Sequence, residues 1–220
     1  MPLTAAEQAI LANPLSTQAQ VEGVIDSVNF DDAAACTAAL ATAHIGLMNG
    51  VRTRTLAGLT DNPRELDTII SFAAFNDGLA CNAALNNLNP GIADNINPAS
   101  AIKLASLADN QIDLMQIIAL NSFTAAACEV ALHNAAIGGI DQASKNRMLA
   151  ISVKSSDHGL PMLKANPVIF GNAITHLNQH DKADLAKAVI NSNDTKLRDQ
   201  ILAAAPELKA TMGAASRGKR

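Results

Sequence analysis

The stretch DNPRELDTIISFAAFNDGLACNAALNNL, residues 61–88, decides the fold, because it recurs once upstream and once downstream in the chain. Each copy keeps the same order of a helical apolar pattern, a phenylalanine and a cysteine. The aligned residues are Ile25, Phe30, Cys36 and Leu40 upstream, Ile70, Phe75, Cys81 and Leu85 in the centre, and Ile118, Phe123 and Cys128 downstream. Repetition every 45–48 residues is typical of stacked helical units that are too small to bury their apolar faces alone.

Each unit is expected to fold as a helix, a tight turn and a second helix. In the central copy, residues 66–73 carry apolar side chains at helical spacing, and Asn76-Asp77-Gly78 then breaks the pattern. A second apolar stripe follows through Leu79, Ala83 and Leu88. The residues expected to cap the second helix of the three copies are Asp31, Asp77 and Thr124.

These patterns predict a single all-α domain of stacked helical hairpins over residues 1–211, either α-solenoid-like or an irregular helical bundle. The three repeats are expected at about residues 17–50, 61–90 and 109–140, followed by C-terminal helices in residues 141–211. Residues 51–59 are expected to connect the first two copies, and residues 99–107 to form an extra leading helix in the third. The small and basic residues 212–220 are expected to form a flexible tail.

The composition favours helices and argues against two kinds of partner. Hydrophobic residues make up 49% of the 220 residues but aromatic ones only 2%, so the core must be built from Ala, Leu and Ile. The net charge of −4 and the lack of aromatic stacking platforms argue against nucleic-acid binding, which needs a basic face. The longest apolar stretch, residues 112–140, is interrupted by polar and charged residues, so no transmembrane span is expected.

The N-terminus and the cysteines indicate a reducing compartment. MPLTAAEQAI has no basic segment and no long apolar run, so it does not read as a secretory signal, and a cytoplasmic location is expected. Three cysteines at equivalent repeat positions suit buried thiols better than disulfides. Without a Gly-rich phosphate loop, a G-x-S-x-G motif or a C-x-x-C pair, no cofactor is expected.

The segment AITHLNQHDKADLAKAVI, residues 173–190, resembles the helix-turn-helix of an ankyrin repeat, and residues 101–119 and 148–163 are similar to it. The motif's proline is absent from all three segments, and a HEAT-like stack fits the repeat spacing equally well. The ankyrin resemblance implies protein binding through a helical face. Degenerate helical repeats also resemble those of effector proteins that intracellular bacteria deliver into host cells, which implies action inside a host cell.

A metal site or an enzyme is the alternative function. His176, His180 and Asp184 follow one another at intervals of four residues, which would place two imidazoles and a carboxylate on one helical face. Asp181 reads as a helix cap between them, and no H-E-x-x-H glutamate accompanies the histidines. The competing interpretation places His176 in an ankyrin-like turn and His180 in a solvated loop.

The favoured function is therefore a protein-protein interaction module. Its partner-binding residues are expected in the repeat turns, at Asn76, Asp77, Asn121 and Thr124. An enzyme would instead show a deep polar cavity with converging His, Asp or Cys groups, most plausibly near His176 and His180. A third possibility, an oligomeric structural protein, would show a large apolar outer face. The sequence leaves the partner and the oligomeric state open.

Overall fold

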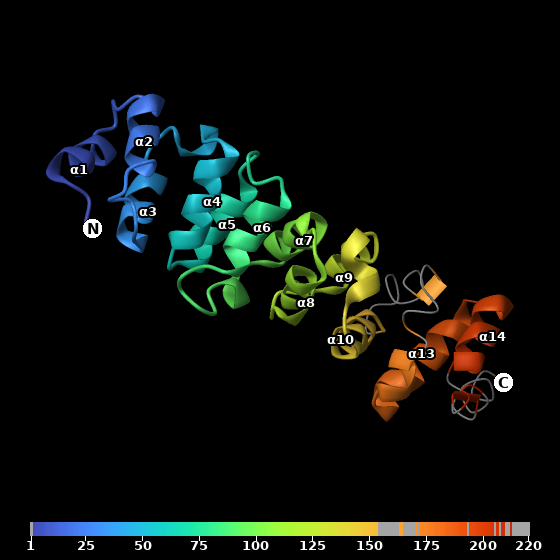
Figure 1. Ribbon diagram of the computed structural model, residues 1–220. Helices are drawn as coiled ribbons and strands as arrows, with labels where there is room; N and C mark the ends of the chain where they lie inside the picture. The colour runs from blue at the N-terminus through green and yellow to red at the C-terminus, as the bar shows by residue number, and fades with distance from the viewer. Residues whose placement is uncertain are drawn as a thin grey trace. The chain divides into compact units, whose positions relative to one another are not determined.

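The chain is an all-α protein of stacked helical hairpins, as its sequence predicts (Figure 1). The computed structural model describes residues 2–153, 163–164, 170, 172–192, 194–204, 206, 208–209 and 212. Apart from Met212, the expected tail at residues 212–220 lies outside these described residues. No helix in the described part of the chain is long and apolar enough to cross a membrane.

The chain divides into two compact units, and the division falls inside the third repeat. The first unit holds Met1–Asp109 and Leu120–Ser122, and the second holds Asn110–Ala119 and Phe123–Arg220. The first unit contains α1 (Ala5–Ala12), α2 (Gln18–Ile25), α3 (Ala33–Leu40), η1 (Ile45–Leu47), α4 (Gly50–Leu59), α5 (Pro63–Ser71), α6 (Gly78–Leu85), η2 (Ala93–Asn95) and α7 (Pro98–Leu107). The second contains α8 (Gln111–Ala119), α9 (Ala125–Leu132), η3 (Ala135–Gly139), α10 (Gln142–Ser152), η4 (Asn172–His176), α13 (Gln179–Asn191) and α14 (Thr195–Ala204).

The repeat consists of three α-helices followed by a short 3-10 helix. This order occurs along the chain as α1–α3 with η1, as α4–α6 with η2, and as α7–α9 with η3. The expected connector at residues 51–59 is therefore wrong, because these residues form α4, the first helix of the second repeat. Similarly, α7 is not an addition to the third copy but its equivalent first helix. Helix α4 is difficult to predict from the sequence, because the buried positions of α4 include Thr53 and Ala57, which make no strong apolar stripe.

All three α-helices of a repeat contribute to its core, and the first helices bury residues such as Leu56 of α4 and Leu104 of α7. The second helices bury the same three apolar positions, and the phenylalanine that follows each helix is at most 5% exposed. The third helices bury two alanines and the cysteine that lies between them. The buried residues are Val21, Val24, Ile25, Ala35, Cys36 and Ala39 in the first repeat, Leu66, Ile69, Ile70, Ala80, Cys81 and Ala84 in the second, and Leu114, Ile117, Ile118, Ala127, Cys128 and Ala131 in the third.

The expected second apolar stripe of the central copy is wrong. Leu79 is 60% exposed and Leu88 is 70% exposed, while Ala83 is half-buried. The face of α6 that carries Ala80 and Ala84 is buried instead. Small side chains allow neighbouring helices to approach closely, and a leucine on that face would not fit in the space between them.

Side-chain caps define where the helices begin. The first helices of the second and third repeats, and α10, start after Asn49, Asn97 and Asp141, and each of these accepts a backbone N–H three residues further on. Asp77 caps α6 as expected. In the first repeat, however, the cap of α3 is Asp32 and not Asp31, and Thr124 precedes α9 without a side-chain capping bond.

The three cysteines connect consecutive repeats. Each sulfur donates a weak hydrogen bond to a main-chain carbonyl on the next first helix, at 3.5 Å for Cys36 with Leu56, 3.6 Å for Cys81 with Leu104 and 3.7 Å for Cys128 with Met148. All three cysteines are buried thiols outside any disulfide, which confirms that part of the prediction. Burial raises the pKa of Cys36 to about 12 and that of Cys128 to about 11, so both remain neutral donors.

The segment with the strongest ankyrin resemblance contains only one α-helix. Residues 173–190 form most of η4, a 3-10 helix, and then α13, so a second α-helix of the ankyrin pair is missing there. The similar segment at residues 148–163 lies partly outside the described residues.

Candidate functional site

The predicted turn residues lie in both units. Asn76 and Asp77 are in the turn between α5 and α6, where Asn76 is exposed and Asp77 is half-buried. Asn121 is exposed and belongs to the first unit, whereas Thr124 is half-buried and belongs to the second. Asp77 has a structural role, because one carboxylate oxygen caps α6 through the Ala80 N–H at 2.8 Å and the other pairs with Arg54 at 2.7 Å.

The proposed metal ligands divide between two helices. His176 ends η4 and is exposed, while His180 and Asp184 lie one turn apart on α13, with His180 Nε2 and Asp184 Oδ2 3.4 Å apart. The cap of α13 is Asn178 and not Asp181, whose N–H donates to the Asn178 side chain at 2.8 Å. Among the described residues, no group of three His, Cys, Asp or Glu side chains could hold a metal ion.

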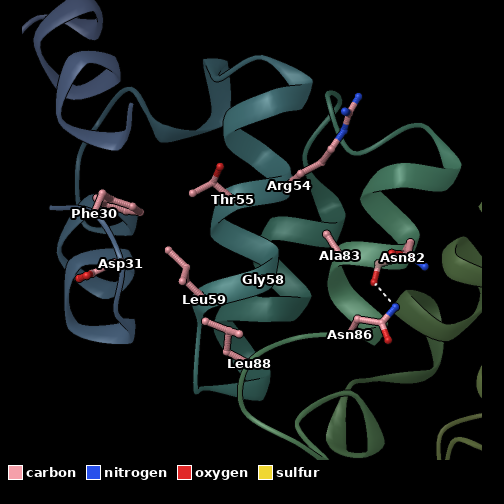
Figure 2. A pocket seen from close by; sticks show the side chains of 10 residues that line it. All are labelled: Phe30, Asp31, Arg54, Thr55, Gly58, Leu59, Asn82, Ala83, Asn86 and Leu88. Atoms are coloured by element: carbon pink, nitrogen blue, oxygen red, sulfur yellow. Dashed lines mark hydrogen bonds between the residues drawn. The ribbon is translucent and has the colours of Figure 1, made fainter. Parts of the chain in front are cut away.

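An open groove of about 520 Å³ lies along α4 and α6 in the first unit (Figure 2). We call it the α4/α6 groove. Thr55, Gly58 and Leu59 contribute one face of α4, and Ala83 contributes a small side chain from α6. Figure 2 shows Thr55 and Leu59 projecting from α4 on the side of Phe30. The remaining lining residues are Asp31, Arg54, Asn82, Asn86 and Leu88.

Hydrogen bonds donated by the Leu88 N–H and by the neighbouring Asn87 side chain hold Leu88 in its exposed position. Its own N–H donates to the Gly58 carbonyl at 3.0 Å. The neighbouring Asn87 is only 8% exposed, and its Nδ2 donates to the carbonyls of Ala57 at 2.6 Å and Thr60 at 2.9 Å. These bonds satisfy carbonyls at the C-terminal end of α4, which have no partners within the helix. The Asn87 side chain therefore fastens this turn to α4 while Leu88 remains 70% exposed.

The polar groups of the groove come mainly from Arg54 and two asparagines. Arg54 pairs with Asp77 through Nη2, and its Nε is buried without a hydrogen-bond partner. The Asn86 side chain donates to the Asn82 main-chain carbonyl at 3.1 Å (Figure 2). Among the described residues that line this groove, Asp31 and Arg54 are the charged ones.

Sequence reasoning missed this groove because it treated Leu88 as a core residue. The available signal was the run Asn86-Asn87-Leu88-Asn89, in which a single apolar residue lies inside an asparagine-rich turn. Asparagine side chains form hydrogen bonds with nearby main-chain groups and so tend to end helices. Leu88, which lies between Asn87 and Asn89, is therefore expected to lie outside the preceding helix.

Comparison of the chain with models of known protein families, with curated proteins and with solved structures finds no match.

Proposed function

We propose that this chain is a protein-protein interaction module that binds a partner protein through the α4/α6 groove. The observation that carries the proposal is the fixed exposure of Leu88, at 70%, beside an open and largely apolar groove. An apolar side chain held in place before binding loses little conformational entropy when a partner covers it. Exposed apolar surface of this kind is typical of protein-binding sites.

The charge of the first unit indicates what the partner presents. Residues 1–109 contain eleven Asp and Glu against four Lys and Arg, so the groove lies in a strongly acidic unit. A partner with an apolar anchor surrounded by basic residues would be attracted to this surface, and added salt would weaken the attraction.

The test compares Leu88→Ser with a matched variant, Leu47→Ser, because Leu47 is 65% exposed and lies outside the groove. The wild-type chain and both variants serve as bait for proteins from bacterial and eukaryotic lysates, and bound proteins are quantified by mass spectrometry. A specific partner should bind to the wild type and to Leu47→Ser but be lost with Leu88→Ser. Equal capture by all three forms, or no specific capture by the wild type, would contradict the proposal.

A further inference from the structure

The first helices of the three repeats, together with α10 and α13, begin at capping residues that are followed by different neighbours. The side chain of each cap accepts the main-chain N–H of the third residue further on. The caps are Thr4 for α1, Asn49 for α4, Asn97 for α7, Asp141 for α10 and Asn178 for α13. The residues directly after them are, in the same order, Ala5, Gly50, Pro98, Gln142 and Gln179. An asparagine cap is therefore followed by glycine at α4 alone among these five helices, and Asn49-Gly50 is the only Asn-Gly pair in the sequence.

An asparagine that is followed by glycine can lose its side-chain amide without an enzyme. The main-chain nitrogen of the glycine attacks the side-chain carbonyl carbon of the asparagine, which closes a five-membered succinimide ring and releases ammonia. Water then opens the ring at one of its two carbonyls and leaves either aspartate or isoaspartate. Glycine favours ring closure because it has no Cβ and adopts main-chain angles that other residues avoid. Proline prevents ring closure, because its nitrogen carries no hydrogen.

The Asn49-Gly50 pair is accessible, and its reacting nitrogen lies outside the helical hydrogen-bond ladder. Asn49 is exposed, and Gly50 is the first residue of α4, so the Gly50 N–H has no acceptor within the helix. The nearest atom to a Cβ added at Gly50 is the Ala74 carbonyl oxygen at 3.5 Å, so no neighbour crowds the glycine. Ring closure has to break the capping bond from the Arg52 N–H to Asn49 Oδ1, at 3.1 Å, and helix ends fray readily.

The other cap followed by glycine in the first unit, Asp77 before Gly78, is protected. One oxygen of the Asp77 carboxylate accepts the Ala80 N–H at 2.8 Å, and the other pairs with Arg54 at 2.7 Å. The Asp109 side chain lies directly over Gly78, where a Cβ would overlap it. These contacts hold both members of the pair in place. The accessible site is therefore the start of α4.

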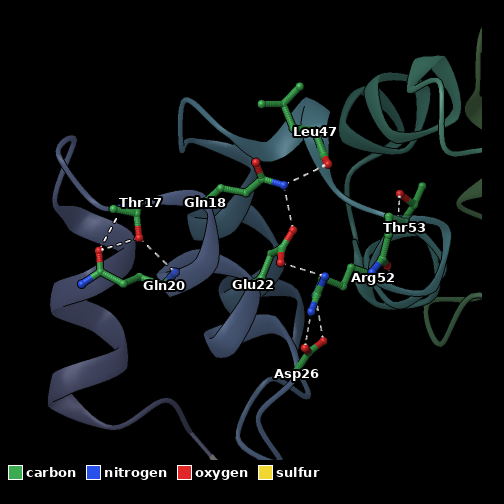
Figure 3. Close-up of polar contacts among 9 residues, drawn as sticks. Thr17, Gln18, Gln20, Glu22, Asp26, Leu47, Arg52 and Thr53 are labelled. Atoms are coloured by element: carbon green, nitrogen blue, oxygen red, sulfur yellow. Dashed lines mark hydrogen bonds and ion pairs between the residues drawn. The ribbon is translucent and has the colours of Figure 1, made fainter.

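The two products would affect α4 differently. Aspartate at position 49 would keep the cap and add a negative charge at the helix N-terminus, where such a charge is stabilising. Isoaspartate adds one methylene to the main chain and moves the remaining carboxylate, so the cap would be lost. Helix α4 also joins the first two repeats, because Arg52 pairs with Glu22 at 3.0 Å and with Asp26 on the preceding repeat (Figure 3). Loss of the cap would loosen the turn of α4 that carries this ion pair.

We propose that Asn49 is a self-modification site, at which the chain deamidates through a succinimide formed with the Gly50 nitrogen. The Gly50 hydrogen leaves with the side-chain amide group as ammonia. One water molecule then adds its hydroxyl to the ring carbonyl that is opened and its hydrogen to the released nitrogen. The new carboxylate makes the net charge of −4 more negative by one. This modification does not depend on the binding of a partner in the α4/α6 groove.

The test keeps the purified chain at pH 8 in native buffer, and samples taken over time are digested and analysed by tandem mass spectrometry. Deamidation of Asn49 should be about tenfold or more faster than that of Asn178, which is a cap followed by glutamine. Asn97 should remain unchanged, because Pro98 follows it. Isoaspartate should accompany aspartate at position 49, since direct hydrolysis of the side chain would give aspartate alone.

Gly50→Pro removes the attacking N–H and copies the Asn97-Pro98 sequence of the next repeat. The variant should preserve α4, because proline is favoured at the first helical position and Asn49, with ψ of 170°, already has the extended conformation that precedes proline. Deamidation of Asn49 should fall below detection in this variant. Gly23→Ala is the matched control, because it changes a glycine on α2 that has no atom within 4 Å of the added Cβ, and it should deamidate like the wild type.

The products test the effect on the junction between the first two repeats. Asn49→Asp reproduces one product and should unfold at the same urea concentration as the wild type or at a higher one. The isoaspartate form, separated from the aged chain by ion exchange, should unfold at a lower urea concentration because its cap is lost.

Three results would overturn the proposal. These are an Asn49 that deamidates in urea but stays intact in the native chain, deamidation of Asn49 no faster than that of Asn178, or unchanged deamidation in Gly50→Pro. None of these measurements involves a partner protein, so failure of this proposal is distinguishable from failure of the α4/α6 groove.

Discussion

Replacement of Asn87 by alanine tests whether buried amide contacts fasten the Leu88 turn to α4. The variant removes donors to the carbonyls of Ala57 at 2.6 Å and Thr60 at 2.9 Å, and an acceptor for the Asn89 N–H at 2.7 Å. Each such bond contributes about 0.5–1.5 kcal/mol, so the loss of three should lower the free energy of unfolding by about 2–4 kcal/mol. For a chain of this length, the midpoint of thermal unfolding should fall by roughly 5–12 °C.

The assay is urea and thermal unfolding followed by circular dichroism at 222 nm. Asn86→Ala is the matched control, because the adjacent Asn86 is exposed and its side chain makes one hydrogen bond, to the Asn82 carbonyl at 3.1 Å. An exposed substitution of this kind should change the free energy of unfolding by no more than about 0.5 kcal/mol. Equal destabilisation by the two variants would refute the argument that burial and bonding of Asn87 hold the turn. The same Asn87→Ala variant should weaken every interaction that depends on Leu88.

Three further predictions follow from the packing. Because burial raises the pKa of Cys36 to about 12, its thiol should resist iodoacetamide at pH 8 in the folded chain and react after unfolding in urea, as read by mass spectrometry. Gly78→Ala should lower the free energy of unfolding in urea by about 1–3 kcal/mol, because the added Cβ would overlap the Asp109 side chain. The control Gly23→Ala should be neutral or stabilising, because no atom lies within 4 Å of the Cβ added there. Hydrogen bonds from the Ser144 N–H and side chain lower the pKa of Asp141. The stability that the Asp141 carboxylate contributes should therefore be present at neutral pH and be lost as the pH falls through that lowered pKa. An ordinary pKa for Asp141 in a carboxylate NMR titration would contradict this prediction.

Much of the fold could be predicted from the sequence because the repeat carries its own pattern. The apolar spacing of Leu66, Ile69 and Ile70 and the phenylalanine that follows predict a buried helix and turn, and all three positions are buried. The helix α4 was missed because its buried face carries Thr53 and Ala57 beside Leu56, so the buried positions share one face but show little apolar contrast. A buried face made of threonine and alanine gives only a weak amphipathic signal in the sequence.

The partner-binding residues expected from the sequence stay predictions. The turn residues were chosen because loops carry function, yet Asp77 is occupied in capping α6 and pairing with Arg54. The α4/α6 groove depends on Leu88, whose role follows from what lies around it in space.

The sequence by itself determined the helical class, the length of the repeat and the burial of one phenylalanine and one cysteine in each copy, because these depend on periodic local patterns. Tertiary structure decided which side chains of the third helices face inward. The inner face takes Ala80, Cys81 and Ala84 because closely packed helices leave room only for small side chains, and Leu79 and Leu88 are left exposed. The same close packing decides where apolar surface remains for a partner, since a groove opens only where neighbouring helices fail to fill the space between them.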